Sequence, residues 1–385
     1  MKITVSVGGR FHAFYLAREL LKRGYLHRLI TSYPKWAVKK YGIPPAKITS
    51  LVINEILQRL WFSRPNFIKG YYNPRFFISD LFDRQASKYI NETDIFVGWS
   101  GFSLYSLKEA KSLKAITILE RGSSHISFQE RIVKEEFQKL GVRFNYVHPR
   151  IREKELLEYA EADYIEVPSS FAKKTFMDYG MNENKIIQSA LGVDLSEFRN
   201  IPKEDNIFRI VYCGGFTLRK GLLYLLKAFY ELDLSEAQLW LIGSLGPELK
   251  PFLKKYDNGR VYCKGPYPQK ELYKYYSQGS VFVFPSLEDG FGLVILQAMA
   301  CGLPVIATVN TAGPDIIRDG LDGFIIPIRD TNALKEKIFY FYSHPEACKA
   351  MGAQALAQVR ANFTWGRYGE RIAQTYLKLL NTKKG

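Results

Sequence analysis

The sequence predicts an α/β protein of two domains, each built on a parallel β-sheet covered by helices. Short apolar runs, typical of buried strands, alternate along the chain with amphipathic helical patterns, and a glycine or polar turn follows most of these runs. The alternation breaks over residues 192–206, where glycine, proline and charged residues replace the periodic pattern. The 385 residues are also too many for one comfortable core.

The first half begins with a strand over residues 2–7 that ends in a glycine turn. A helix is predicted over residues 12–23, because alanine and leucine recur there at helical spacing and Gly24 stops the pattern. Further apolar runs predict strands at residues 95–98, 115–119 and 164–167. Ser169 or Ser170 is a suitable N-cap for the helix that follows the last of them.

The second half repeats this alternation and therefore predicts a second sheet. Strands are predicted at residues 208–213, 238–242, 261–263, 281–284 and 305–308. Helices are predicted at residues 222–229, 293–301, 332–341, 345–363 and 365–380. We place an N-terminal domain at residues 1–195 and a C-terminal domain at residues 207–362. Residues 363–385 would form a terminal helix that packs back toward the N-terminal domain.

The composition is that of an ordinary globular protein, with 47% hydrophobic and 24% charged residues. No apolar run approaches the roughly 18 residues that span a bilayer. The N-terminal residues lack the cationic head and apolar stretch of a signal peptide. The four cysteines form no Cys-x-x-Cys pair, so neither a zinc site nor a disulfide framework is expected. We therefore expect a cytoplasmic protein.

The net charge of +16 is concentrated at the start of the chain, since residues 1–100 hold 16 Lys and Arg against 6 Asp and Glu. Residues 61–82 of this stretch are also rich in aromatic side chains. Basic and aromatic residues together suit peripheral contact with an anionic membrane on its cytoplasmic face. A solvated basic face over an ordinary aromatic core explains the pattern equally well, and we expect no nucleic-acid partner.

Candidate ligand-binding residues follow from the fold class, because open parallel sheets bind ligands beyond the carboxyl ends of their strands. In the first half these ends carry Gly9 and residues 121–125, and in the second half residues 214–220, Gly265 and residues 285–292. Two such edges that face each other would form a cleft between domains, which is a common location for ligands.

The most specific of these turns is residues 286–292, which leads straight into the helix predicted at residues 293–301. Gly290 and Gly292 would let backbone N–H groups approach an anion, and the helix N-terminus adds about half a positive charge. Asp289 stands at the mouth of the turn, and Gln297 lies about two turns into the helix. A Gly-x-Gly turn that only packs the helix on the sheet is the alternative.

A second turn, residues 214–221, places Arg219 and Lys220 at the edge of the same sheet. A cation in this position can neutralise a diphosphate. The segment has neither the spacing of a Walker A loop nor that of the dinucleotide-binding fingerprint. A solvated basic pair is the alternative for these two residues alone.

Taken together, these segments resemble the family-four retaining glycosyltransferases, also called group 1 glycosyl transferases, which have the GT-B fold. The segments that carry the resemblance are residues 208–221, with Arg-Lys-Gly, 284–293, with Asp-Gly-Phe-Gly, and 297–305. Residues 192–194, 313–315, 322–324 and 363–365 continue the match. The resemblance implies an α/β fold of two Rossmann-like domains with parallel sheets facing an interdomain cleft. It also implies that the N-terminal domain, residues 1–195, binds the acceptor and that the C-terminal domain, residues 207–362, binds the nucleotide-sugar.

The activity that this resemblance implies is a hexosyltransferase-type transfer in glycan or glycolipid biosynthesis. A sugar would move from a nucleotide-diphosphate sugar to the hydroxyl of a sugar or lipid-linked acceptor, with retention of configuration. No Asp-x-Asp sequence occurs in the chain, so we expect no metal and no other cofactor. A sugar-nucleotide epimerase on the same scaffold and a non-catalytic nucleotide-sugar-binding protein are the alternatives.

The resemblance also implies roles for individual residues in the second half. Lys220, assisted by Arg219, would pair with the donor diphosphate. The turn Gly290-Phe291-Gly292, followed by Leu293, would offer backbone amides to the phosphate and the sugar. Asp289 would hold hydroxyls of the donor sugar, at a position where the family usually has Glu, and the neighbouring Glu288 is a second candidate for this role.

Four further residues complete the candidate site. Gln297 would hold the ribose hydroxyls, where the family usually has a second Glu. Gly9, Gly215 and Gly265 would line the donor site, and Gly215 replaces the Arg that is frequent in the family. His125 follows a strand of the first half, where such enzymes often have a His near the reacting sugar, although a structural His is the alternative. The candidate catalytic residues are thus Lys220, Asp289 and His125.

Overall fold

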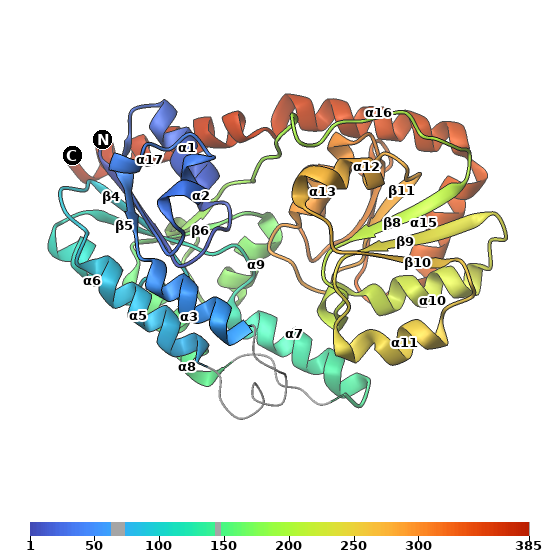
Figure 1. Cartoon of the computed structure of the whole chain (residues 1–385), viewed down its shortest axis with the longest axis horizontal. Coiled ribbons are helices and arrows are strands. Elements are labelled where there is room, and N and C mark those ends of the chain that lie inside the picture. Colours follow the sequence, from blue (N-terminus) through green and yellow to red (C-terminus); the bar gives the residue numbers. More distant parts are fainter. Residues whose placement is uncertain (63–73, 143–147, 385) are drawn as a thin grey trace.

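Each half of the chain forms one parallel sheet flanked by helices, as a computed structural model shows (Figure 1). The structure describes residues 1–62, 74–142 and 148–384. Residues 63–73 of the predicted aromatic segment lie outside the described residues. The predicted α/β fold of two parallel-sheet domains is confirmed.

The first sheet has seven strands in the order β3-β2-β1-β4-β5-β6-β7. Their bounds are β1 Ile3–Val7, β2 Leu26–Thr31, β3 Ile48–Ser50, β4 Ile95–Trp99, β5 Ile116–Glu120, β6 Tyr164–Val167 and β7 Ile186–Gln188. The sequence did not predict β2, β3 and β7. Both outermost strands, β3 and β7, have three residues, and β2 carries the polar pair His27 and Arg28, so none of these strands forms a long apolar run.

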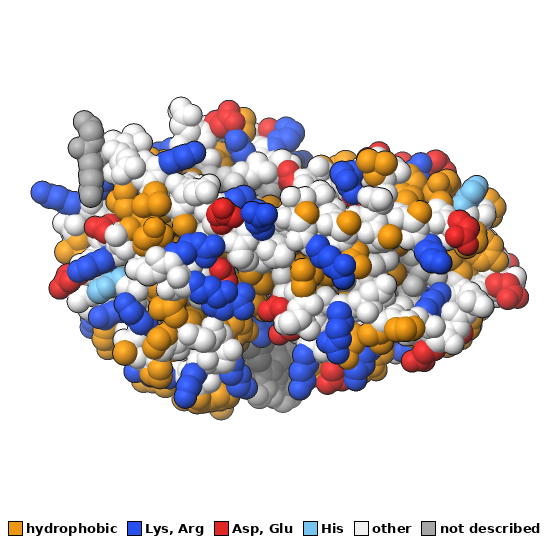
Figure 2. All heavy atoms as spheres, turned by 90° about the horizontal axis from the view of Figure 1, so that it is seen from above, with side chains coloured by type: hydrophobic (Ala, Val, Ile, Leu, Met, Phe, Trp, Pro, Cys, Tyr) orange, Lys and Arg blue, Asp and Glu red, His pale blue; other side chains and the backbone are white. Residues whose placement is uncertain are grey.

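The helices that cover this sheet are α1 Ala13–Lys22, α2 Lys35–Lys39, α3 Val52–Phe62, α5 Arg75–Ser87, α6 Leu104–Ser112, α7 Ile126–Lys139, α8 Pro149–Glu161 and α9 Ser170–Asp178. The predicted cap of α9 is confirmed, because the Ser169 hydroxyl accepts a hydrogen bond from the backbone N–H of Ala172 at 3.1 Å. Figure 2 shows Lys and Arg side chains among hydrophobic ones over this half of the molecule, at the left.

The second sheet has six strands in the order β10-β9-β8-β11-β12-β13. Their bounds are β8 Phe208–Cys213, β9 Ala237–Ile242, β10 Val261–Gly265, β11 Val281–Phe284, β12 Val305–Thr308 and β13 Gly323–Ile326. The strands β11 and β12 are buried along their whole length, as expected for central strands covered on both faces. The sequence did not predict β13, an edge strand whose middle residues are only half-buried.

The helices of the second half are α10 Leu222–Leu232, α11 Lys250–Lys255, α12 Leu272–Tyr276, α13 Leu293–Ala300, α14 Gly313–Ile316, α15 Thr331–Ser343, α16 Pro345–Asn362 and α17 Trp365–Lys384. Short 3₁₀ turns lie at η3 Leu218–Lys220 and η5 Gln269–Glu271. The helix α10 is apolar around nearly its whole circumference, and it packs against α15 and α11.

The last helix, α17, crosses back to the first half, where it packs against α1 (Figure 1). Arg23 donates from Nη2 to the backbone oxygen of Gly366 at 3.0 Å, and the Tyr376 hydroxyl donates to Glu166 Oε2 at 2.6 Å. Within the described residues, no helix combines the length and the apolar character needed to cross a bilayer.

Candidate active site

The candidate site lies where the strand order of the second sheet reverses. The chain runs outward from β8 through β9 to β10 and then returns to the other side of β8 as β11. Such a reversal opens a crevice at the carboxyl ends of the two central strands. The turns at residues 214–221 and 285–292 follow β8 and β11, so both predicted segments lie at this point.

Close packing fixes the two turns against each other. The backbone N–H of Leu287 donates to the carbonyl of Arg219 at 2.9 Å. Gly221, with a φ of 66°, lies so close to the other turn that a Cβ there would be 1.8 Å from the carbonyl oxygen of Pro285. Only glycine meets both conditions, because other residues disfavour a positive φ and carry a Cβ. The fold therefore requires glycine at position 221, directly after Lys220.

Lys220 and the glycine turn converge on the carboxylate of Asp289. The Lys220 ammonium, at the end of η3, hydrogen-bonds and pairs with Asp289 Oδ2. The other oxygen, Oδ1, accepts hydrogen bonds from the backbone N–H groups of Phe291 at 3.2 Å and Gly292 at 3.1 Å. Gly292, with a φ of 79°, is the N-cap of α13. A cation and the N-terminus of a helix thus act together on one anionic group.

The environment of Lys220 favours an anionic partner. Burial and the nearby charge of Arg219 lower the pKa of Lys220, while Asp289 and Glu288 raise it. The side chain is only 14% exposed. A buried ammonium remains charged only when it is paired, so any ligand that displaces Asp289 from Lys220 must bring negative charge of its own.

Glu288, next in the chain to Asp289, is fully buried and binds groups of both halves. Its Oε1 accepts from the hydroxyls of Ser123 at 2.7 Å and Ser124 at 2.8 Å, both in the loop after β5. Its Oε2 accepts from Gln129 Nε2 of α7 and from Arg219 Nη1, each at 2.9 Å. These partners use both oxygens, so Glu288 joins the two halves while Asp289 faces Lys220.

These contacts also keep Glu288 ionised. Burial alone would raise the pKa of its carboxyl group, but the charge of Arg219, the hydrogen bonds from Ser123 and Gln129, and the charge of Lys220 lower the pKa to about 2. The ion pair with Arg219 is therefore present at neutral pH.

Gly290 is required by a contact between the halves. A Cβ at this position would lie 2.4 Å from the carbonyl oxygen of Gly122 and equally close to the Cα of Ser123. Its own carbonyl oxygen accepts a hydrogen bond from the Ser169 hydroxyl at 2.5 Å. The carboxyl-end loops of β5 and β6 therefore pack directly on the glycine turn, so the two predicted edges face each other.

The helix α13 supplies the remaining candidates of this cluster. Leu293 is its first residue and is half-buried. Gln297 is 9% exposed, and its Oε1 accepts a hydrogen bond from the Tyr276 hydroxyl at 3.2 Å. The side-chain amide is thus held in place from one side.

The other glycine candidates lie farther along the two edges. The carbonyl oxygen of Gly215 accepts from the Tyr212 hydroxyl at 2.8 Å, directly after β8. Gly265 ends β10, which β9 and β8 separate from β11. Gly9 follows β1 in the first sheet, and its carbonyl oxygen accepts from the Thr31 hydroxyl at 3.2 Å.

His125 is the N-cap of α7, where its Nδ1 accepts from the backbone N–H of Ser127 at 3.2 Å. The ring stacks on Tyr179 with 4.5 Å between centroids and packs against Tyr159 and Phe176 at 5.1 Å. Burial and the charges of two nearby arginines lower its pKa to about 4, so the ring is neutral at neutral pH. These are the contacts of a structural His, the alternative that the sequence left open.

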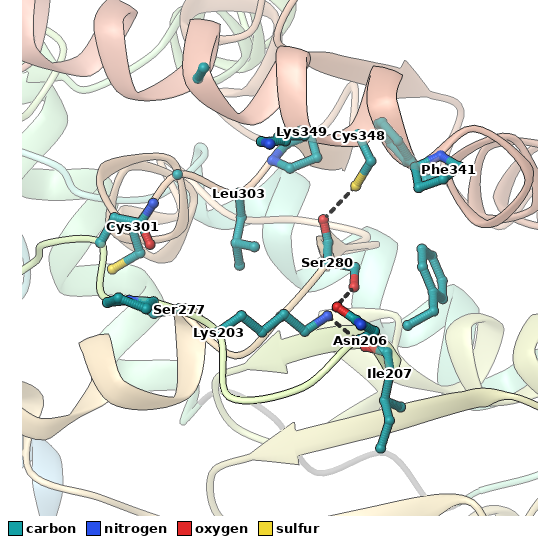
Figure 3. A pocket seen from close by; sticks show the side chains of 18 of the residues that line it. Lys203, Asn206, Ile207, Ser277, Ser280, Cys301, Leu303, Phe341, Cys348 and Lys349 are labelled. Carbon is teal, nitrogen blue, oxygen red and sulfur yellow. Dashed lines mark hydrogen bonds between the residues drawn. The ribbon is translucent and has the colours of Figure 1, made fainter.

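A large cavity, of about 1310 Å³, lies at the opposite edge of the second sheet (Figure 3). It is lined by residues that precede strands, such as Ile207 before β8 and Ser280 before β11. Lys203 donates from Nζ to the Ser280 hydroxyl at 2.9 Å, and the Cys348 thiol donates to the Ser280 carbonyl at 2.8 Å (Figure 3). Because ligands of such sheets bind at the carboxyl ends, this cavity is not the candidate active site.

Two residues of the site, Gln129 and Ser169, were missed by the sequence analysis, whereas Arg121 was among the predicted residues 121–125. Arg121 donates to Gln129 Oε1 at 3.1 Å and pairs with Glu155 at 2.8 Å, which supports the loop beneath Glu288. Ser169 lies just after β6, and that position is the only signal that could have identified it.

Comparison with known proteins finds a family match within the second half of the chain. Residues 207–344 match the family model described as glycosyl transferases group 1. The chain is 28% identical over 169 residues to an uncharacterised glycosyltransferase of Methanocaldococcus jannaschii, which covers 44% of this chain and 48% of that protein. It is 33% identical over 178 residues to the putative glycosyltransferase EpsD of Bacillus subtilis, covering 45% and 46%. The chain thus spans about half the length of these curated relatives.

Solved structures resemble the whole chain. Sucrose-phosphate synthase of Thermosynechococcus elongatus superimposes with a TM-score of 0.71 at 20% identity, covering 99% of this chain and 100% of that one. HepE of Anabaena, in complex with UDP, superimposes with a TM-score of 0.69 at 15% identity, covering 98% and 100%. At these identities the likeness establishes the fold. Residues 207–344 therefore form a glycosyl transferases group 1 domain, set in a chain that has the GT-B fold.

Proposed function

We propose that the chain is a glycosyltransferase that moves a sugar from a nucleotide-diphosphate sugar to an acceptor hydroxyl, with retention of configuration, in glycan or glycolipid biosynthesis. One observation carries the proposal, namely the convergence of the Lys220 ammonium and the amides of Phe291 and Gly292 on a single carboxylate. A diphosphate offers the same kind of oxygen with more negative charge. The matched domain and the relatives named glycosyltransferases support this reading.

The donor would bind by displacing the Asp289 carboxylate from Lys220 and from the backbone amides. Its diphosphate takes over Lys220 and the amides at the N-terminus of α13, which releases the Asp289 carboxylate to accept hydrogen bonds from the sugar hydroxyls. Gln297, in the middle of the same helix, would accept from the ribose hydroxyls. Arg219 stays paired with Glu288 and adds positive charge beside the diphosphate.

In the transfer step, the acceptor hydroxyl oxygen bonds to the anomeric carbon on the face from which the diphosphate leaves. The bond between that carbon and the phosphate oxygen breaks, and the leaving phosphate oxygen takes the hydroxyl proton. Negative charge grows on the diphosphate, where Lys220 and the helix N-terminus stabilise it. This scheme needs no metal ion and no other cofactor.

The acceptor would be a sugar or a lipid-linked sugar. The basic surface of the first hundred residues suits contact with an anionic membrane on its cytoplasmic face. UDP in the HepE structure supports a nucleoside diphosphate leaving group for this fold.

The experiment that tests the proposal is transfer from a panel of nucleotide-sugars, with release of nucleoside diphosphate as the readout and Lys220→Ala as the variant. Removing one group that stabilises the transition state costs about 10²–10³ in rate, so Lys220→Ala should lose that much in kcat while the protein stays folded. The control is Lys227→Ala, whose side chain is 46% exposed on α10. Near-normal turnover by Lys220→Ala would contradict the proposal.

Two further arms of the same assay test its finer parts. The anomeric coupling constant of the product, read by NMR before mutarotation, should match that of the donor, because the sugar configuration is retained. Turnover should persist in EDTA, since Lys220 and the amides supply the positive charge. Isomerisation of the donor without any acceptor would instead indicate an epimerase.

A further inference from the structure

The apolar face of α3 points away from the protein. Ile53, Ile56, Leu57 and Leu60 recur at helical spacing and are 57%, 53%, 40% and 59% exposed. On the other side of the helix, Asn54 is buried. A helix on the surface of a globular protein normally turns its apolar stripe toward the core, so this reversed orientation calls for an apolar partner outside the part of the chain that the structure describes.

The short helix α2 continues this surface with an exposed aromatic ring among cations. Trp36 is 68% exposed, and the Lys40 ammonium lies 5.4 Å from the centre of its ring. Lys35 and Lys39 are also exposed. Aliphatic side chains on the outside, with tryptophan and lysine at their border, are typical of surfaces that lie in the interface of an anionic membrane.

Between α2 and α3 the surface opens into a cavity of about 530 Å³. Its walls are mainly aromatic and aliphatic, and they include Phe14, Tyr33, Trp36, Tyr41, Val52 and Ile56. Three cations, Arg10, Lys40 and Arg59, line the cavity with a single carboxylate, Glu55. Since Glu55 pairs with Arg59 at 2.7 Å, the cavity keeps a positive balance.

The cavity lies at the edge of the first sheet that faces the second half of the chain. Arg10 follows β1, Tyr33 follows β2 and Val52 follows β3, so all three mark carboxyl ends of strands. Arg10 also reaches across the domains, with its Nη2 donating to Oε1 of Gln269 in η5 at 3.4 Å. A ligand held here would meet the carboxyl-end edge of the second sheet.

We propose that the face of α3 with Trp36 rests on an anionic membrane and that the cavity between α2 and α3 binds the phosphate-bearing head of a lipid-linked acceptor. The phosphate would contact Arg10 and Lys40, and the first part of the lipid chain would lie against Trp36 and Ile56. This inference rests on the proposed glycosyltransferase function and names the class of its acceptor.

Vesicle flotation of the full chain tests the membrane face. The wild type should float with vesicles of phosphatidylcholine and phosphatidylglycerol, and more weakly with phosphatidylcholine alone. The triple variant Ile53→Ser/Leu57→Ser/Leu60→Ser, which spares the cavity, should bind at least about tenfold more weakly, because each side chain loses its transfer into lipid. The matched control is Leu321→Ser/Phe339→Ser, whose side chains are 58% and 51% exposed in the second half.

Two outcomes of this experiment overturn the membrane assignment. One is wild-type binding no stronger than that of the triple variant. The other is a concentration-dependent dimer, seen by sedimentation without vesicles and abolished by the triple variant, since the apolar face would then be a contact between two copies of the chain.

A soluble short-chain lipid tests the cavity. Monomeric dihexanoyl phosphatidic acid should bind the wild type in calorimetry, and Lys40→Glu should weaken that binding at least about tenfold. Lys254→Glu, an exposed lysine of α11, is the control. Inorganic phosphate that binds as well as the lipid, or Lys40→Glu that binds the lipid like the wild type, would overturn the inference.

Nucleotide-sugar binding, measured on the same proteins, separates this inference from the proposed function. The variants in α2 and α3 should bind the donor normally, because Lys220 and the glycine turn are intact. A wild type that binds nucleotide-sugar but neither vesicles nor the short-chain lipid would leave the proposed function standing and remove the acceptor assignment.

Discussion

Asp289 and Glu288 are adjacent carboxylates with different partners. Asp289 faces Lys220 and the amides of α13, within its own sheet. Glu288 turns the other way and binds Ser123 and Gln129 of the first half. A single turn thus presents one carboxylate toward the candidate donor site and uses the other to fasten the loop of β5 beneath it.

The first prediction concerns Glu288→Gln. Its carboxyl pKa is about 2 in the folded protein against an ordinary value of 4.5, so its ionisation stabilises the fold above pH 4.5 and this contribution disappears as the pH falls toward 2. The shift corresponds to roughly 3 kcal/mol. At pH 7 the free energy of unfolding of the Gln variant should therefore be lower than that of the wild type by about 3 kcal/mol, and the variant should unfold at a lower urea concentration. At pH 3 this gap in the free energy of unfolding should be narrower.

Urea titrations at the two pH values measure this gap. Glu346→Gln, an exposed glutamate on α16, is the control and should show little effect. A gap that is equally wide at pH 3 and pH 7 would mean that the Glu288 charge does not contribute to the joint between the halves.

For single residues, the sequence predicted the position of each candidate more readily than the direction in which its side chain points. Lys220 and Asp289 were predicted together because both follow central strands, and the structure brings them together. Glu288 and His125 could not be assigned in the same way. The direction of the Glu288 side chain depends on Ser123, which lies 165 residues away in the chain. The ring of His125 packs against aromatic rings from α8 and α9.

At the scale of elements, the site depends on how two turns and one loop pack. The reversal of strand order at β8 and β11 brings residues 214–221 beside residues 285–292. The loop after β5 then packs on Gly290 from the other half. Apolar runs predicted the inner strands of both sheets except β2, whose run is interrupted by His27 and Arg28. The other missed strands, β3, β7 and β13, lie at sheet edges, where half-polar patterns of three or four residues carry little signal.

The second prediction is that Gly290→Ala separates the two halves. Its Cβ would lie 2.4 Å from backbone atoms of the loop after β5, so that loop must move and the hydrogen bonds to Glu288 must weaken. We expect kcat to fall at least about tenfold and the radius of gyration, measured by X-ray scattering, to rise. Its matched control is Gly122→Ala in the facing loop, where a Cβ has no atom within 4 Å.

Equal effects of the two alanine variants would contradict this reading, because both substitutions add the same methyl group to the same contact region. A Gly290→Ala enzyme with normal kcat and unchanged scattering would show that the turn and the loop adjust without cost.

At the scale of the whole molecule, the C-terminal helix ties the halves together through a buried acidic cluster. Glu120 and Glu166 are neighbours across β5 and β6, and both are buried. His12 Nε2 lies 2.9 Å from Glu120 Oε1, while the Tyr376 hydroxyl of α17 donates to Glu166. Two buried carboxyl groups side by side cannot both ionise cheaply, so α17 is held by a partly protonated network.

The third prediction follows from this cluster and concerns Glu166→Gln. Burial, and then the charge of Glu120, raise the pKa of Glu166 well above 4.5. From pH 4.5 upward to that raised pKa, the folded state holds a proton that the unfolded state has lost, so the free energy of unfolding falls as the pH rises.

A glutamine keeps an oxygen for the Tyr376 hydroxyl and never ionises. Glu166→Gln should therefore be more stable than the wild type at pH 8 and equally stable near pH 4.5. Urea titrations at both pH values, with the exposed Glu109→Gln as the control, measure this difference. A variant that is less stable than the wild type at pH 8 would show that the ionised carboxylate of Glu166 is what anchors α17, because only a charged partner for Tyr376 would then account for the loss.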